Sequence, residues 1–256
     1  MAENKQKFEK PAGGPGSMRG GFGKPKDLKA TALRTFSYLT KRPLMLVAAL
    51  ISVILSSLSG VAGTYAMRPI INGLTDFAHP CQVLADLMTI REKMTRLEGL
   101  KLCFIGDGNN MANSLIVGGL KCGMDVSVAC PAGYDPDPRV LDFAKTVTGA
   151  GFALCRDPKQ AAKDADVIIT DVWASMGQEG EKAKREAAFG GVYQVNEALM
   201  AVAHPGAMVQ HCLPAHRGEE ITAEVFEAHA GEIFDEAENR LHAQKAVMFL
   251  LMGEKN

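Results

Sequence analysis

From about residue 74 onward, short apolar runs alternate with longer segments whose apolar positions recur at helical spacing. The short runs predict buried parallel strands, and the longer segments predict the helices that cover them. The predicted strands are Lys101–Gly106, Asp125–Cys130, Gly151–Cys155, Asp166–Thr170 and Ala207–His211, with a short one near Glu232–Phe234. The predicted helices are Pro80–Met94, Asn110–Lys121, Arg139–Thr148, Pro158–Asp164, Lys182–Phe189, Asn196–Ala203, Ala223–Ala228 and Asn239–Leu251. This alternation predicts an α/β fold, a Rossmann-like parallel sheet flanked by helices, whose strand order the pattern leaves open.

The pattern before residue 74 is different. Residues 1–28 combine glycine, proline and lysine with few aliphatic residues, which predicts a disordered basic tail. Residues 29–73 begin with a basic amphipathic lead and continue into Pro43–Met67, which contains no charged residue. Because a bilayer requires roughly 20 apolar residues, residues 43–67 predict a transmembrane helix, with a soluble core helix as the alternative. The basic residues before it favour a cytoplasmic amino terminus. A cleaved signal peptide is disfavoured, because the basic lead is long and the apolar stretch exceeds the usual apolar core of a signal peptide.

Charge and cysteine content narrow the possible functions. The net charge of the 256 residues is −1, which argues against a nucleic-acid-binding protein. The charge is uneven, because residues 1–42 hold ten Lys or Arg against three Asp or Glu, a net of +7, and the remainder sums to −8. The six cysteines form no Cys-x-x-Cys pair, so we expect no metal site and mostly reduced core thiols.

Polar residues follow two of the predicted strands. Asp171 opens the loop Asp-Val-Trp-Ala-Ser-Met-Gly-Gln after one strand, and Cys212 follows another within His-Cys-Leu-Pro. Open α/β sheets bind ligands at the carboxyl ends of their strands, so both loops are candidate sites. Gly106-Asp107-Gly108-Asn109-Asn110 follows the first strand, but Met111 replaces the third glycine of a dinucleotide fingerprint. We therefore expect no nucleotide cofactor.

These two loops, together with Glu236-Ala-Glu-Asn-Arg240, resemble the ornithine-binding half of the ornithine carbamoyltransferase family over residues 74–256. The resemblance implies transfer of a carbamoyl group from carbamoyl phosphate to L-ornithine, giving L-citrulline and phosphate in arginine biosynthesis. It implies no cofactor and no metal, a cytoplasmic location and a homotrimer. Asp171 alone would otherwise be a helix cap or turn residue about as often as a ligand.

The resemblance also assigns roles to individual residues. The family's ornithine-binding positions correspond to Asn110, Asp171, Ser175 and Met176. The positions that contact carbamoyl phosphate correspond to His79, Gln82, Cys212, Leu213 and Arg240. The resemblance implies catalytic roles for Asp171, Cys212 and Arg240, with a thiolate and a carboxylate orienting the ornithine amine.

Two of these assignments, the His-Pro-Cys-Gln motif and Arg240, have an alternative in which the residues have only a structural role. His79 and Gln82 belong to His-Pro-Cys-Gln at a predicted helix start, where backbone N–H groups favour an anion. Spacing alone favours a capped helix with a surface His there, and the resemblance favours the contact with carbamoyl phosphate. For Arg240 the alternative is a helix-surface ion pair with Glu236, which would contribute little to stability.

The resemblance has gaps. The family's Ser-Thr-Arg-Thr-Arg phosphate loop does not occur in the chain, so we expect the carbamoyl-phosphate domain to be missing and the activity to be impaired. The last helix packs on that domain in the family, so its apolar residues are expected to be exposed; they are Ala246, Val247, Phe249, Leu250 and Leu251. A membrane-anchored, non-catalytic module that binds an amino acid is the alternative function.

Residues 28–74 also resemble the first membrane segment of an ABC exporter permease, and no Walker motif follows. The stretch from Pro69 to Leu74 suits both resemblances. This suggests the hypothesis that the chain is a chimera, joined between Gly63 and His79.

Overall fold

The computed structural model describes residues 29, 33, 44, 47, 51–59, 75–174 and 179–252. By its internal contacts the chain divides into two units, Met1–Gly63 and Thr64–Asn256. In the first unit residues 51–59 are helical and exposed.

Most of the predicted transmembrane helix, residues 43–67, lies outside the described residues. Within the part that is described, no helix is long and apolar enough to cross a membrane. The structure therefore gives the predicted span no support.

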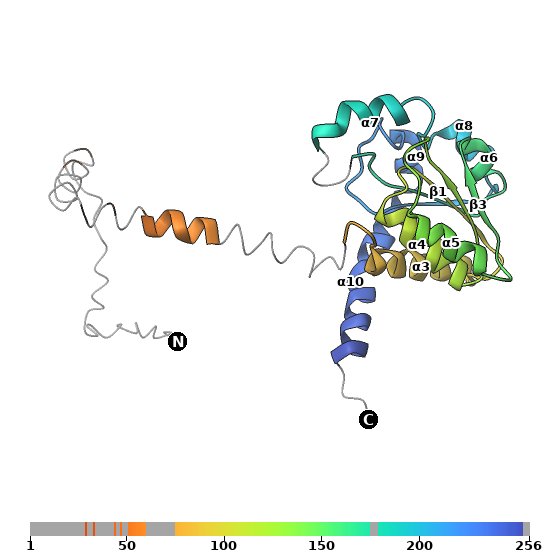
Figure 1. Ribbon diagram of the computed structural model, residues 1–256, viewed down its shortest axis with the longest axis horizontal. Coiled ribbons are helices and arrows are strands. Elements are labelled where there is room, and N and C mark those ends of the chain that lie inside the picture. The colour runs from red at the N-terminus through yellow and green to blue at the C-terminus, as the bar shows by residue number, and fades with distance from the viewer. Residues whose placement is uncertain are drawn as a thin grey trace, which may run out of the picture. The chain divides into compact units, whose positions relative to one another are not determined.

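The second unit is built on a parallel sheet (Figure 1). Its strands are β1 (Lys101–Ile105), β2 (Asp125–Ala129), β3 (Phe152–Cys155), β4 (Val167–Thr170) and β5 (Met208–His211). Their order is β3-β2-β1-β4-β5, and every pair is parallel. Strands β2 and β3 lie on one side of β1, and β4 and β5 lie on its other side. The direction in which successive strands are added therefore reverses between β1 and β4. Such a reversal opens a crevice at the carboxyl ends of the strands.

The helices are α3 (Pro80–Met94), α4 (Asn110–Lys121), α5 (Pro138–Thr146), α6 (Pro158–Ala162), α7 (Lys182–Phe189), α8 (Glu197–Met200), α9 (Ala223–Ala228) and α10 (Ala230–Met252). Alternate residues of β1 divide them into two layers. Leu102 and Phe104 pack with α3, α4 and α5, whereas Cys103 and Ile105 pack with α6 to α9 and the start of α10. All four side chains are fully buried, as the near-continuous apolar strands of a parallel sheet require.

Helix α10 departs most from the predicted pattern. It starts nine residues before the predicted Asn239, and the strand predicted near Glu232–Phe234 is wrong because those residues form its first turns. Ile233 and Glu236 are buried while Phe234 is exposed, which is helical spacing and not strand alternation. The helix packs along α3, and its carboxyl-terminal turns extend beyond the rest of this unit (Figure 1). Phe249, Leu250 and Leu251 are 74–79% exposed there, as predicted.

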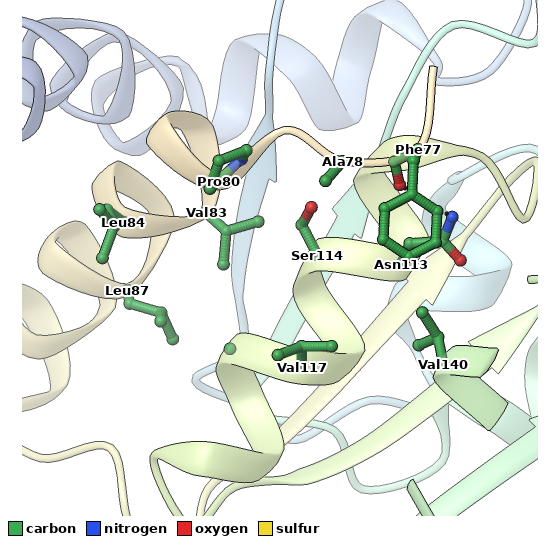
Figure 2. Close-up of a pocket in the computed structure, with 11 residues that line it drawn as sticks. Phe77, Ala78, Pro80, Val83, Leu84, Leu87, Asn113, Ser114, Val117 and Val140 are labelled. Carbon is green, nitrogen blue, oxygen red and sulfur yellow. Dashed lines mark hydrogen bonds between the residues drawn. The ribbon is translucent and has the colours of Figure 1, made fainter. Parts of the chain in front are cut away.

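Helices α3 and α4 approach closely at Gly118. A Cβ at this position would lie 2.7 Å from Cγ1 of Val83, so any residue larger than glycine would displace the Val83 side chain. Beside this contact the two helices enclose an apolar pocket of about 320 Å³. Figure 2 shows Val83, Leu84 and Leu87 of α3 facing Ser114 and Val117 of α4 across it.

Candidate functional site

The strand ends at the reversal of the sheet bring three polar side chains together. Asn109 lies at the end of the loop after β1, Asp171 directly follows β4, and Cys212 directly follows β5. The loop after β1 is held down at Gly108, where a Cβ would lie 2.3 Å from the carbonyl carbon of Asp135. Asn109 then caps α4 by accepting from the backbone N–H groups of Met111 and Ala112.

Asp171 is at the centre of this group. Its side chain is buried, and Oδ1 accepts from the Cys212 thiol at 3.0 Å and from the Val172 backbone N–H at 2.8 Å. Its Oδ2 accepts from Nδ2 of Asn109 at 3.2 Å. The structure thus brings together Asp171 and Cys212, as the resemblance implied. It also adds Asn109, which the sequence analysis missed although its place at the start of a helix after β1 was visible.

Cys212 acts here as a hydrogen-bond donor. Burial of the sulfur raises the pKa of its thiol well above the usual range, and the charge of Asp171 raises it further. The raised pKa favours a neutral thiol beside Asp171, and the thiolate that the resemblance implies remains a prediction. A neutral S–H can orient the carboxylate without adding a second negative charge.

Of the other predicted ornithine-binding residues, only Asn110 lies in the described part of the chain. The side-chain N–H of Asn110 donates to the backbone carbonyl of Thr75 at 2.8 Å, which ties α4 to the segment before α3. Ser175 and Met176 lie outside the described residues.

A buried ion pair supports the loop that carries Asp171. Nη1 of Arg185 on α7 lies 2.5 Å from Oδ2 of Asp107 and donates to the Trp173 carbonyl at 2.9 Å. Its guanidinium also lies over the ring of Tyr134. These contacts connect the loop after β4 to the loop after β1, and sequence spacing offered no signal for them.

His79 and Gln82 open α3 beside these strand ends. The backbone N–H of His79 donates to Oγ of Ser114 at 2.8 Å, and its ring is buried. Burial, together with the positive charge of Arg240, lowers the pKa of the imidazole to about 4, so the ring is neutral at pH 7. The predicted alternative of a surface His is therefore wrong.

Gln82 connects α3 with α10. It is buried, and its Nε2 donates to Oδ1 of Asp86 at 2.9 Å and to Oε1 of Glu236 at 2.8 Å. Arg240 lies one turn beyond Glu236, is partly buried, and influences both His79 and Asp86 electrostatically. Glu236 is fully buried, which contradicts the alternative of a surface ion pair between these two residues.

The His211-Cys-Leu-Pro loop is fixed by its histidine. The backbone N–H of Leu213 donates to Nδ1 of His211 at 3.0 Å, so the ring proton resides on Nε2 and is directed to Glu220 at 3.1 Å. Leu213 is partly buried and precedes a cis peptide bond to Pro214. This arrangement holds the backbone on either side of Cys212.

A buried carboxylate, a thiol and an amide lie at the reversal of a doubly wound sheet, which is where α/β proteins of this class bind ligands. Residues 98–251 match the family model described as aspartate/ornithine carbamoyltransferase, Asp/Orn binding domain. Residues 49–92 match the model described as aspartate/ornithine carbamoyltransferase, carbamoyl-P binding domain. The chain therefore belongs to the aspartate/ornithine carbamoyltransferase family.

Curated relatives agree. The chain is 56% identical over 192 residues to the ornithine carbamoyltransferase of Thermococcus kodakarensis, covering 74% of this chain and 61% of that protein. It is 54% identical over 188 residues to that of Geobacter sulfurreducens, covering 73% and 62% respectively. The chain thus spans about three fifths of the length of the curated relatives it matches.

Solved structures give the same result. The ornithine carbamoyltransferase of Gloeobacter violaceus superposes with a TM-score of 0.65 at 53% identity, covering 71% of this chain and 61% of that one. That of Pyrococcus furiosus gives 0.66 at 52% identity, covering 72% and 59%.

These comparisons correct three expectations. The expected absence of the carbamoyl-phosphate domain is not supported, because its family model matches residues 49–92, which include His79 and Gln82. The absence of the Ser-Thr-Arg-Thr-Arg motif concerns only one segment of that domain. The expected impairment of the activity is therefore not supported. The same match runs across the join proposed for a chimera and through much of the segment compared with an ABC exporter, so neither hypothesis is supported. The homotrimer and the cytoplasmic location remain predictions.

Proposed function

We propose that this chain transfers the carbamoyl group of carbamoyl phosphate to the side-chain amine of L-ornithine, releasing L-citrulline and phosphate. The observation that carries this proposal is the buried Asp171 carboxylate, hydrogen-bonded to Cys212 and Asn109 at the reversal of the sheet. The 56% identity to a curated ornithine carbamoyltransferase supports the choice of ornithine.

Asp171 would hold the ornithine amine. A buried carboxylate favours a cationic ligand, because the charge it carries is otherwise uncompensated in a medium of low dielectric constant. The amine must lose a proton before it attacks, and Asp171 is the nearby base that can accept that proton. Cys212 and Asn109 limit rotation of the carboxylate by bonding to its two oxygens.

The carbamoyl end would be formed by α3 and α10. The first turn of α3 presents backbone N–H groups, which favour an anion, and Arg240 adds a fixed positive charge. Nδ1 of the neutral His79 imidazole and Oε1 of Gln82 are both buried, and neither has a hydrogen-bond partner among the described residues. Such atoms can bond a carbamoyl group.

In the transfer the amine nitrogen bonds to the carbamoyl carbon, and a tetrahedral oxyanion forms. The bond from carbon to the phosphate oxygen then breaks, and phosphate leaves with the electron pair. The nitrogen gives its second proton to the departing phosphate as the amide forms. Holding the two substrates together and placing positive charge beside the developing oxyanion account for the rate.

The test is citrulline formation by the purified full-length chain with ornithine and carbamoyl phosphate, beside the Arg240→Ala variant. We expect citrulline from the wild type and a large rise in KM for carbamoyl phosphate in the variant. Folded protein that binds ornithine but forms no citrulline would overturn the proposal and favour a non-catalytic amino-acid-binding module.

A further inference from the structure

Two carboxyl groups are buried together between α3 and α10. Asp86 and Glu236 are both 0% exposed. Each accepts from the same donor, Nε2 of Gln82, and the other oxygen of Glu236 accepts from the His211 backbone N–H at 2.9 Å. The Asp86 backbone carbonyl accepts from Gln210 at 3.1 Å, which ties this turn of α3 to β5.

Two fully buried carboxyls that share one hydrogen-bond donor disfavour ionisation of both at once. Burial raises the pKa of Asp86 to about 7, and burial together with the neighbouring Asp86 raises the pKa of Glu236 well above its usual range. Oδ2 of Asp86 has no hydrogen-bond donor among the described residues. Asp86 and Glu236 also interact directly through their side chains, and a proton held between them would supply such a donor.

The charged and titratable groups around the pair favour a single proton. Arg240 on α10 stabilises the charge of Asp86, while Asp171 after β4 opposes it. Both buried carboxyls help to keep the Cys212 thiol after β5 protonated. With one positive charge facing them, the pair is most stable with one negative charge.

The pair also fixes the orientation of the Gln82 amide. Both amide hydrogens donate to carboxyl oxygens, so a 180° rotation of the amide would lose two buried hydrogen bonds. The carbonyl oxygen is left buried with no donor in the described part of the chain, as is Nδ1 of His79 one turn earlier. An N–H donor on a bound ligand would satisfy the carbonyl.

We propose that Asp86 and Glu236 share one proton and together hold the Gln82 amide with its carbonyl oxygen available to the N–H₂ of a carbamoyl group. Both are positioning residues, since they act through Gln82 and do not contact the substrate. This inference rests on the proposed function for the identity of the ligand, but the shared proton stands on the geometry of the pair alone.

Two isosteric variants separate this arrangement from simple packing. In Glu236→Gln the new amide oxygen must accept from the His211 N–H, so its N–H₂ group faces the N–H₂ of Gln82 and forces that amide to rotate. In Asp86→Asn the new N–H₂ can donate to Glu236 while the new oxygen still accepts from Gln82, so the orientation is kept. Lys93→Met is the control, because it removes a surface ion pair with Asp235 between the same two helices.

The first readout is infrared absorption of the full-length chain at pH 7. We expect a C=O band from a buried protonated carboxyl in the wild type and in Lys93→Met, and no such band in Glu236→Gln or Asp86→Asn. A wild-type protein without the band, or a band that survives in both variants, would overturn the shared proton. This readout does not depend on activity.

The second readout is the Michaelis constant for each substrate. Loss of one buried hydrogen bond should raise KM for carbamoyl phosphate about 10- to 100-fold in Glu236→Gln and less than about fivefold in Asp86→Asn. KM for ornithine should stay close to its wild-type value in both variants. Equal effects of the two variants, or equal effects on the two substrates, would overturn the positioning role.

Failure of the proposed function has a different signature. If the wild type forms no citrulline, calorimetric titration with carbamoyl phosphate replaces the second readout, with the same ranking of variants expected. One outcome is that the wild type shows the band but forms no citrulline, and that Glu236→Gln binds carbamoyl phosphate more weakly. That outcome would reject the proposed reaction and retain the positioning role. The band without any binding of carbamoyl phosphate would reject that role.

Discussion

The two ends of the candidate site are built differently. The amine end comes from loops at adjacent strand ends, where Asp171 already has a hydrogen bond to each carboxylate oxygen. The carbamoyl end comes from two helices, α3 and α10, and retains buried atoms without partners on His79 and Gln82. A parallel sheet fixes strand ends through its backbone ladder, whereas each contact that positions these two helices involves at least one side chain. The carbamoyl end therefore depends more on a few buried polar contacts.

The largest expected effect is at the amine end. Asp171→Asn keeps the shape of the side chain but removes the charge and the base, so kcat/KM for ornithine should fall about 10³-fold. Steady-state kinetics with carbamoyl phosphate saturating measure this. A decrease of less than tenfold, from protein with unchanged circular dichroism, would show that another group holds the amine.

The next effect concerns the support of that end. Arg185→Met leaves Asp107 buried without its partner, which should cost about 3 kcal/mol in the free energy of unfolding. Urea unfolding at pH 7 measures the cost. KM for ornithine should rise more than KM for carbamoyl phosphate, because the Trp173 loop follows Asp171. A larger change for carbamoyl phosphate would mean that the two ends are not separately supported.

Lowering the pH should decrease the stability of the fold through His79, at the carbamoyl end of the site. The pKa of His79 is lowered to about 4 in the folded chain, so the stability its neutral form contributes is complete above about pH 6.5 and is lost as the pH falls toward 4. At pH 5 the loss should be about 2 kcal/mol. Urea unfolding of the wild type and of His79→Gln at pH 7 and pH 5 tests this. Equal losses in the two proteins would exclude His79 as the cause.

The smallest effect is at the exposed edge between α3 and α10. Lys93 forms an ion pair with Asp235, and both side chains are more than 40% exposed. Lys93→Met should change the free energy of unfolding by less than about 1 kcal/mol, since solvent screens the pair. The thermal midpoint at low and high salt gives the measurement. A change that matches Arg185→Met would remove the distinction between buried and exposed contacts.

Much of the fold was predictable from residue spacing. The bounds of α3, α4, α7 and α9 match the prediction to the residue or nearly so, because each has proline, a capping residue or a sharp change of polarity at its ends. The first turns of α10 were not predictable from spacing, because the adjacent apolar residues Ile233 and Phe234 resemble a short strand. Helical packing on α3 overrides that local pattern.

The candidate site was predictable only in part. Asp171 and Cys212 were found, since polar residues at strand ends and a family resemblance both point to them. Asn109 was missed, and so were Asp86 with Glu236 and Arg185 with Asp107. Each of these contacts joins segments far apart in the chain, and no spacing rule encodes such pairs.

Residue spacing and short motifs alone were enough to predict the alternation of strands and helices, the polar residues at the strand ends, and the family resemblance. These follow from local periodicity and from short motifs, which involve neighbouring residues only. The tertiary structure decided the strand order, the contact between Asp171 and Cys212, and the burial of two carboxyls beside Gln82. Those depend on which elements pack together, and only that packing removes water from charged groups and so shifts their protonation.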